Sequence, residues 1–333
     1  MSINIYTSVK SNLTVVLFKI LLLCSGIFLL SPNALLAQQE PQFTLNRYTH
    51  SYVNPGAYGL QDGISITGVF RQQWTGLKDD NNVSIAPQTI LFLADSPIRI
   101  LHGGIGVSIV QDKYGYFTDM GVKLGYSYHR NLGAGKLGIG VSGNFINKKL
   151  DFSKLIWLDE SDPVKSDAAA EGVMYTDISA GVHYVHPKYF ISFASSQILQ
   201  TSKSLSNAED QSGYYSNRRH YYLSGGYNLV IPALGQYTFT PGMTLKTDGA
   251  VVQADFNTIV NFNKKIWGGL NYRLGDTFGI MAGMFYKEFE IGYAYDFPMS
   301  RIAGFGSHDI IIRYLFKIEK DKVRKGYHNT RFL

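Results

Sequence analysis

The amino-acid sequence predicts an all-β protein: a transmembrane, antiparallel, up-and-down β-barrel of about 14 strands, preceded by a cleaved signal peptide. Three observations carry this prediction. Segments that alternate between apolar and polar residues recur along the chain, long and short connections alternate between them, and the composition is rich in glycine and aromatic residues but poor in charge. This combination is typical of strands that face lipid on one side and a polar interior on the other.

The clearest alternating segment is 118–130 (TDMGVKLGYSYHR). Side chains of a strand point alternately to opposite faces, so its apolar residues share one face and its polar residues share the other. Met120 and Leu124 fall on the first face, whereas Asp119 and Lys123 fall on the second. The segment is also long enough to cross a bilayer as a tilted strand, which takes about 9–11 residues.

Similar segments recur from residue 63 to the end of the chain. In 250–262, for example, Val252 and Phe256 oppose Gln253 and Asp255. The expected strands are approximately 63–74, 87–95, 103–111, 118–130, 136–147, 173–186, 188–198, 218–230, 236–246, 250–262, 266–274, 277–286, 288–297 and 307–317.

The connections between these segments give a second regularity. Those after the odd-numbered strands include the long stretches 148–172 and 199–217, whereas those after the even-numbered strands are mostly tight, as at 263–265. Outer-membrane barrels have short periplasmic turns and longer extracellular loops. Two connections on the long side, 247–249 and 275–276, are shorter than this pattern expects.

The composition favours a membrane barrel over a soluble fold. The chain has 34 glycines and 23 tyrosines but only 17% charged residues, compared with about 25% in typical soluble domains. In lipid every backbone amide must be paired, so a spanning sheet has to close on itself. Two soluble β-domains are the alternative fold.

Residues 1–37 are expected to be a signal peptide. Two lysines precede or flank an apolar run at 20–30, and cleavage is expected after Ala37. A short membrane anchor and a lipoprotein acylated at Cys24 are the alternatives. Cys24 is the only cysteine, so the mature chain would contain neither a disulfide nor a cysteine nucleophile.

The mature chain is expected to have three parts. An N-terminal segment, 38–61, would lie in the periplasm, 62–317 would form the outer-membrane barrel, and 318–333 would be a basic periplasmic tail. The formal net charge of +6 belongs mainly to the leader and the tail, so it does not indicate nucleic-acid binding by the barrel. The tail is interpreted either as a solvated end or as a docking segment for an acidic periplasmic partner.

No motif indicates catalysis, a cofactor or a metal site. Gly133, Gly135 and Gly138 have the spacing of a dinucleotide fingerprint, but a strand follows where that fingerprint needs a helix. His183 and His186 would face opposite sides of a strand with no nearby carboxylate, which disfavours metal binding. The protein is therefore expected not to be an enzyme, and an envelope hydrolase is the least supported alternative.

The long loop 148–172 contains an apolar patch next to acidic residues. Apolar patches that are centred on tryptophan and rimmed by polar residues often anchor protein interfaces. A loop that folds over the barrel mouth and packs on itself is the alternative. Trp74, at the end of an expected strand, is interpreted as an anchor at the membrane interface. The expected partner-binding residues are Lys154, Leu155, Ile156, Trp157 and Leu158.

Several stretches resemble the PorP/SprF family of Bacteroidota. The resemblance begins with Gln42-Phe43 and is most specific where Asn54-Pro55-Gly56 occurs. In the C-terminal half of the chain the resemblance lies mainly in the spacing of the strands. The stretches that carry the resemblance are 52–59 (YVNPGAYG) with Asn54 and Pro55, 71–77 (RQQWTGL) with Trp74, 103–109 (GGIGVSI) with Gly103 and Gly104, 112–115 (DKYG), 122–129 (VKLGYSYH) and 151–156 (DFSKLI).

This resemblance implies an outer-membrane β-barrel of the type IX secretion system. Such proteins assist the export or surface attachment of secreted proteins that carry a C-terminal sorting domain, including adhesins of gliding motility. The implied partners are outer-membrane lipid, such a secreted protein and other secretion-system components, with no cofactor and no catalytic residue. A solute channel or transporter is the alternative function, and Asp119, Lys123, Asp255 and Arg313 would line its pore.

Overall fold

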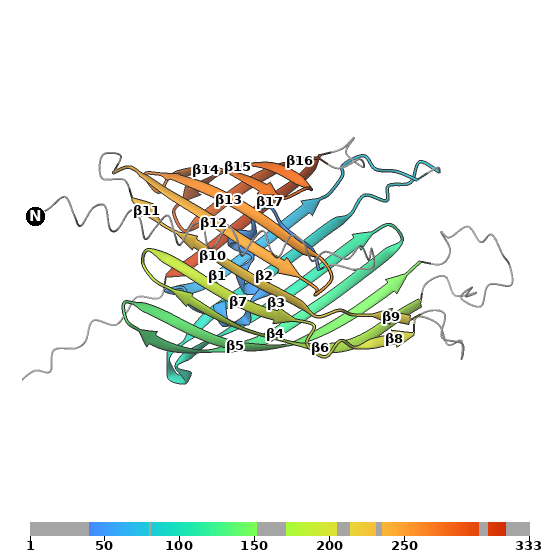
Figure 1. Ribbon diagram of the computed structural model, residues 1–333, viewed down its shortest axis with the longest axis horizontal. Helices are drawn as coiled ribbons and strands as arrows, with labels where there is room; N and C mark the ends of the chain where they lie inside the picture. Colours follow the sequence, from blue (N-terminus) through green and yellow to red (C-terminus); the bar gives the residue numbers. More distant parts are fainter. Residues whose placement is uncertain are drawn as a thin grey trace, which may run out of the picture.

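The computed structural model describes residues 40–79, 81–151, 171–204, 214–230, 235–299 and 306–317 (Figure 1). These residues form a closed antiparallel β-barrel. Its strands are β1 (Gly63–Gln72), β2 (Gln88–Ile98), β3 (Gly103–Tyr114), β4 (Phe117–Leu132), β5 (Gly135–Leu150), β6 (Glu171–Val185), β7 (Tyr189–Ser196), β10 (His220–Tyr227), β12 (Tyr237–Thr247), β13 (Val252–Phe262), β14 (Ile266–Arg273), β15 (Thr277–Tyr286), β16 (Phe289–Pro298) and β17 (Ser307–Lys317).

Each of the fourteen strands coincides with one of the alternating segments in the sequence, which confirms the predicted fold class. The ring includes the pairing of β1 with β17, in which Arg71 lies opposite Asp309. It also includes the pairing of β10 with β12. The short strand β11 (Leu229–Val230) pairs with β12 beyond the end of β10. A small hairpin of β8 (Ser202–Ser204) and β9 (Tyr214–Ser216) forms a separate sheet. Closure removes the free sheet edges that lipid does not tolerate.

Strand β4 shows the two faces of the barrel wall. Lys123 and Ser127 are 4% and 0% exposed, whereas Leu124 and Tyr128 on the opposite face are 51% and 50% exposed. The polar face therefore points into the barrel and the apolar face points out. A soluble protein has the reverse arrangement, because it buries its apolar side chains.

Exposed apolar side chains continue around the outside of the barrel, where only lipid can cover them favourably. They include Ile66 on β1, Phe92 on β2, Ile109 on β3, Ile139 on β5, Ile191 on β7, Leu223 on β10, Leu270 on β14, Ile280 on β15, Ile291 on β16 and Ile312 on β17.

The two ends of the barrel differ in their connections. The loop end carries 73–87 and 197–219, and the short connections 115–116, 248–251 and 274–276 also lie there. The strands at the other end, called the turn end, are joined mostly by tight turns. These are 99–102, 133–134, 186–188, 263–265 and 287–288, and the first of them contains the 3₁₀ turn η3 (Arg99–Leu101).

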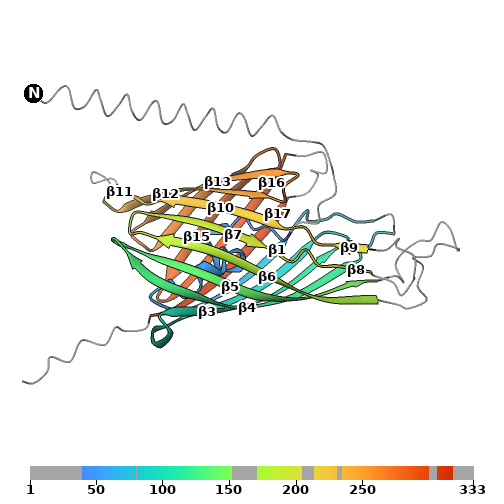
Figure 2. The same ribbon diagram turned by 60° about the horizontal axis from the view of Figure 1, so that its bottom comes forward.

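Residues 40–61 lie inside the barrel and are called the interior segment (Figures 1 and 2). They form η1 (Asn46–Tyr48), α2 (His50–Val53) and η2 (Pro55–Ala57). The helices in the described ranges are all too short to span a membrane.

The position of the interior segment corrects one expectation. The sequence predicts a periplasmic segment at 38–61, whereas Leu45 is 1% exposed and Tyr52 is 3% exposed within the barrel. The buried apolar side chains of this segment lie on short helical turns or in the residues beside them, so they do not follow the alternation that marks the strands. The expected signal peptide and the basic tail fall outside the described residues.

Candidate functional site

Asn54 fixes the interior segment to the wall. Its side-chain carbonyl accepts a hydrogen bond from the Gly56 amide at 2.8 Å, which caps η2. Its side-chain amide donates to the Val182 carbonyl at 3.0 Å and to the Ser192 hydroxyl at 2.7 Å. Pro55 follows as the first residue of the turn. At this position a backbone N–H would have no partner within the turn, so proline, which lacks the N–H, is well tolerated. One side chain thus forms the turn and attaches it to β6 and β7.

Glycines on the inner wall make room for η2 and the residues that follow it. A Cβ atom at Gly140 would lie 2.3 Å from the Pro55 carbonyl oxygen, and one at Gly138 would lie 2.1 Å from the Gly56 carbonyl oxygen. These distances are far shorter than van der Waals contact, so only glycine fits. This surface is called the glycine cradle and consists of Gly104, Gly106, Gly125, Gly138, Gly140 and Gly181.

Polar side chains of the wall pair with the backbone of the segment above the cradle. The Ser127 hydroxyl donates to the Gly56 carbonyl at 3.1 Å, and the Gly59 amide donates to the Asp95 carboxylate at 3.0 Å. His129 Nε2 lies 2.8 Å from the Tyr58 carbonyl oxygen. Buried backbone groups need such partners, and here they come from β2 and β4 rather than from a sheet ladder.

A buried ion cluster holds the segment near its beginning. Arg71 on β1 pairs with Asp309 on β17 and, at 3.2 Å, with Asp296 on β16. The Thr44 amide donates to Asp309 at 2.8 Å, and its hydroxyl donates to Asp296 at 2.5 Å. All four residues are at most 3% exposed. The interior segment therefore contributes hydrogen bonds to both carboxylates of the cluster, which suits charges that have left water.

Glu40 makes a second charged attachment, toward the loop end. Its carboxylate lies 3.3 Å from the Lys123 ammonium and accepts a hydrogen bond from the Tyr222 hydroxyl at 2.9 Å. The Lys246 ammonium donates to the Glu40 carbonyl at 3.2 Å. The Lys123 ammonium also lies 4.0 Å from the ring centroid of Tyr52, a cation–π contact. Both lysines thus bind the segment rather than facing an open pore.

Apolar contacts fill the remaining space around the segment. The ring centroid of Tyr48 lies 5.8 Å from that of Trp267, and the Tyr48 hydroxyl donates to the Glu290 carboxylate. Burial of such side chains is the main favourable term in folding. The apolar cluster comprises Phe43, Leu45, Tyr48 and Tyr52 from the segment with Val69, Leu91, Leu93, Val110, Ile259, Trp267, Met281, Ala294 and Ile311 from the wall.

Two cavities lie on opposite sides of the segment. The loop-end cavity, of about 360 Å³, is lined by Glu40 and Gln42 of the segment. The turn-end cavity, of about 290 Å³, is lined by Arg47 and His50. Different parts of one buried segment line each of them, and the segment lies between the two. A smaller cavity of about 60 Å³ beside the segment shares Gln42 with the first and His50 with the second.

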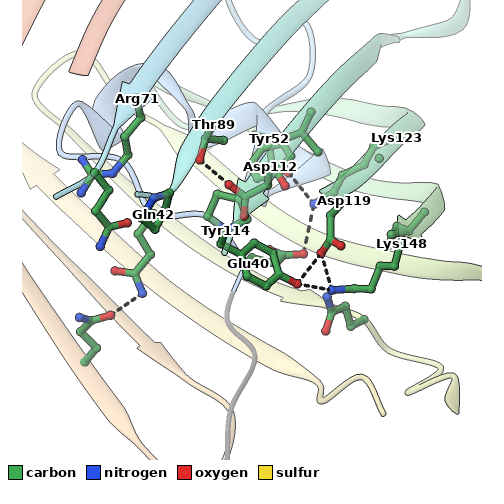
Figure 3. A pocket seen from close by; sticks show the side chains of 18 of the residues that line it. Glu40, Gln42, Tyr52, Arg71, Thr89, Asp112, Tyr114, Asp119, Lys123 and Lys148 are labelled. Carbon is green, nitrogen blue, oxygen red and sulfur yellow. Dashed lines mark hydrogen bonds and ion pairs between the residues drawn. The ribbon is translucent and has the colours of Figure 1, made fainter. Parts of the chain in front are cut away.

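The charged groups of the loop-end cavity are largely paired with one another (Figure 3). Asp119 on β4 pairs with Lys148 on β5 and accepts a hydrogen bond from the Tyr114 hydroxyl at 3.1 Å. Asp112, directly across from Asp119 in the sheet, accepts from the Thr89 hydroxyl at 2.6 Å. Within the described ranges no group of three or more His, Cys, Asp or Glu residues could hold a metal ion.

The structure brings most of the family-motif residues together. Gly104 contacts the segment at Tyr58 and Gly59, and Gly103 packs against Ser127, so residues distant in sequence from Asn54 and Pro55 form one interior site. Trp74 lies apart at the loop end, after β1, where its amide donates to the Ser307 hydroxyl at 3.1 Å. Its expected role as a membrane anchor stays a prediction.

The other expected site residues have different outcomes. The partner-binding candidates Lys154, Leu155, Ile156, Trp157 and Leu158 lie outside the described residues. The four expected pore-lining residues form ion pairs: Lys123 with Glu40, Asp119 with Lys148, Asp255 with Arg273 and Arg313 with Glu290.

A closed barrel that is apolar outside and filled inside by its own chain defines an outer-membrane β-barrel. The sequence matches the family described as type IX secretion system membrane protein PorP/SprF over residues 35–314. The chain belongs to the PorP/SprF family, as its motifs predict. This is a family of secretion-system membrane proteins and not a family of enzymes.

Solved structures with similar architecture are outer-membrane proteins of low sequence identity. Omp33 of Acinetobacter baumannii is 9% identical, with 78% of this chain and 100% of that chain covered and a TM-score of 0.45. The toluene transporter TbuX of Ralstonia pickettii is 11% identical, with coverages of 80% and 92% and a TM-score of 0.46. The KdgM porin in complex with disordered oligogalacturonate is 10% identical, with coverages of 76% and 99% and a TM-score of 0.38. A comparison with curated protein sequences found no match.

The glycine cradle can be tested with two substitutions on one strand. Gly140→Ala should destabilise the folded barrel by about 1–3 kcal/mol, because the new methyl group overlaps the Pro55 carbonyl. Gly143→Ala is the matched control, because a Cβ there meets no atom within 4 Å. Urea unfolding in detergent micelles, followed by heat-modifiable migration on gels, measures both. Equal stability of the two variants would contradict the cradle.

Disruption of the buried ion cluster should destabilise the folded barrel more than the Gly140→Ala substitution does. Arg71→Met should cost about 3–5 kcal/mol, because it leaves two buried carboxylates without their cation. The triple variant Arg71→Met, Asp296→Asn, Asp309→Asn should recover part of that loss, since the unpaired charges are then removed. The same unfolding assay compares the two proteins. A triple variant less stable than Arg71→Met would show that the charges are not the source of the destabilisation.

Proposed function

We propose that this barrel is a non-enzymatic component of the type IX secretion system that assists the export of partner proteins or their attachment to the cell surface. Adhesins of gliding motility with a C-terminal sorting domain are the expected kind of partner. The observation that carries the proposal is the filled interior. A lumen that contains residues 40–61, held by Asn54 and Arg71, leaves no path for a translocating chain. Partners therefore bind to the ends of the barrel.

The loop end is proposed to face the cell exterior and the turn end the periplasm. This orientation follows the usual asymmetry of outer-membrane barrels, with long loops outside and tight turns inside. It would place the basic stretch 318–333 in the periplasm, because β17 ends at the turn end with Lys317. Surface proteins would then contact the loop end.

The loop end offers a pre-formed rim on which a partner can bind. In the connection 73–87 the Asp79 carboxylate accepts hydrogen bonds from the Val83 amide at 2.7 Å and the Tyr116 hydroxyl at 2.9 Å. The Val83 hydrogen bond lowers the pKa of Asp79 below its ordinary value. The carboxylate therefore stays charged and keeps this connection folded against the 115–116 turn.

The sequence patch Leu155-Ile156-Trp157-Leu158 lies in a connection at this same end. A tryptophan among aliphatic residues, flanked by acidic residues, is a composition that often anchors protein interfaces. We assign the partner contact to this patch together with Lys154.

A solute channel is supported less well. The polar interior and its two cavities are features of channels, but ion pairs occupy the expected pore-lining residues, and the interior segment lies between the cavities. Small solutes would have to displace buried contacts to pass.

Replacement of residues 155–158 by Gly-Ser-Gly-Ser tests the partner surface. The variant should release secreted proteins into the medium or leave them undelivered, because their anchor is lost, while the barrel stays folded and heat-modifiable. Protease shaving of intact cells followed by mass spectrometry measures which surface proteins are retained.

Replacement of residues 166–169 in the same loop by Gly-Ser-Gly-Ser is the matched control and should leave the surface proteins unchanged. If the 155–158 variant retains all surface proteins, the patch is not the partner contact. If both variants lose them equally, the loop matters only as a whole.

A further inference from the structure

The exposed charged side chains at the turn end of the barrel are mostly basic. Its tight turns expose five basic side chains, and among the described residues none of the five forms an ion pair. The exposed acidic residues near them are Asp62 and Glu288. The five basic residues are Arg99, Lys188, Lys264, Lys265 and Lys287.

The turn-end cavity has the same character. None of the described residues that line it carries a carboxylate, whereas two arginines and two histidines do line it. Arg313 is engaged by Glu290 at 3.4 Å. Arg47 of the interior segment is exposed and forms no ion pair with a described residue. The loop-end cavity differs, because Asp112, Asp119 and Asp276 line it beside the basic residues.

A buried polar atom without a partner belongs to a residue in the wall of this cavity. His183 on β6 is 6% exposed, and its Nδ1 atom has no hydrogen-bond partner. Its ring stacks on Phe190 and lies 6.0 Å from the ring of His50, so it is held in place. Buried polar atoms are nearly always satisfied, and one left free in a cavity wall indicates a missing ligand or water. Asn228, Asn257 and Thr240 add polar groups around it.

We propose that the turn-end mouth is a docking site for an acidic segment of a partner polypeptide. Arg47 and the cavity receive a carboxylate through charge-assisted hydrogen bonds. The basic turns around the mouth attract the rest of the segment and accelerate its approach.

A polypeptide fits this site better than a lipid headgroup does. Most side chains that line the cavity, among them His183, Asn257 and Arg313, lie on the inner face of the barrel, so the wall separates them from the bilayer. A phospholipid whose tails stay in the bilayer cannot reach Arg47, whereas a chain that approaches along the barrel axis can. The site lies at the end opposite to the proposed surface contact, so it does not rest on that function.

Binding of a fluorescent glutamate-rich peptide to the purified full chain in non-ionic detergent tests the proposal. Fluorescence anisotropy should show binding that weakens as salt is added, and a lysine-rich peptide should not bind. Arg47→Gln should weaken binding about tenfold, the effect of losing one charge-assisted contact. Arg47→Lys should restore most of the affinity. Lys264→Gln with Lys265→Gln should mainly slow association.

The pair Lys113→Gln with Lys149→Gln is the matched control, because these exposed lysines lie at the loop end. It should bind the peptide like the native protein, and all variants should remain heat-modifiable. Absence of binding, or equal affinity in the Arg47→Gln variant, would overturn the proposal. Displacement of the peptide by phosphatidylglycerol vesicles would assign the basic turns to lipid headgroups, and displacement by inorganic phosphate alone would assign the cavity to small oxyanions. Either result would likewise overturn it.

Discussion

A barrel of this size must fill its own lumen or leave it to water, because about eight strands already enclose as much space as inward side chains can fill. Here residues 40–61 fill it. The inner wall is accordingly divided into two kinds of position. Where the backbone of the segment comes closest the wall has glycine, as at Gly138 and Gly140, and where the segment is held it has charge, as at Arg71 and Lys123. The apolar side chains of the outer face are covered only by lipid.

A filled lumen changes what the two ends of the barrel can do. Charged side chains that would otherwise guide solutes are paired inside the barrel. The loops and turns are therefore the parts left to bind partners. The loop end combines acidic and basic groups in its cavity, whereas the turn end is basic and its cavity lacks carboxylates. This asymmetry fits the proposal that different partners contact the protein on the two sides of the membrane.

Alternation along the strands was enough to predict the barrel, since in β4 Lys123 and Ser127 fall on the inner face and Leu124 and Tyr128 on the outer face, as their polarity indicates. The interior segment could not be predicted in this way, because its three short turns have no period long enough to detect. In the sequence Gly138 stands out only by its spacing from Gly133 and Gly135, and its contact with Gly56 depends on the position of a distant segment. The Arg71 cluster joins β1, β16 and β17, so it exists only once the first and last strands have paired. Asn54 and Gly104 were recognised as motif residues, and the structure supplies the contact that explains them.

The most direct test of the account is the chemical accessibility of the interior segment in the folded barrel. Cys24 is the only native cysteine, so a chain with Cys24→Ser can carry single reporters at Leu45 and Arg47. Leu45 is buried against the wall and Arg47 is exposed at the turn-end cavity. In native outer-membrane fragments permeable to the reagent, a polar maleimide should label Arg47→Cys readily and Leu45→Cys only after unfolding. Rapid and equal labelling of both positions in the folded protein would contradict the filled lumen.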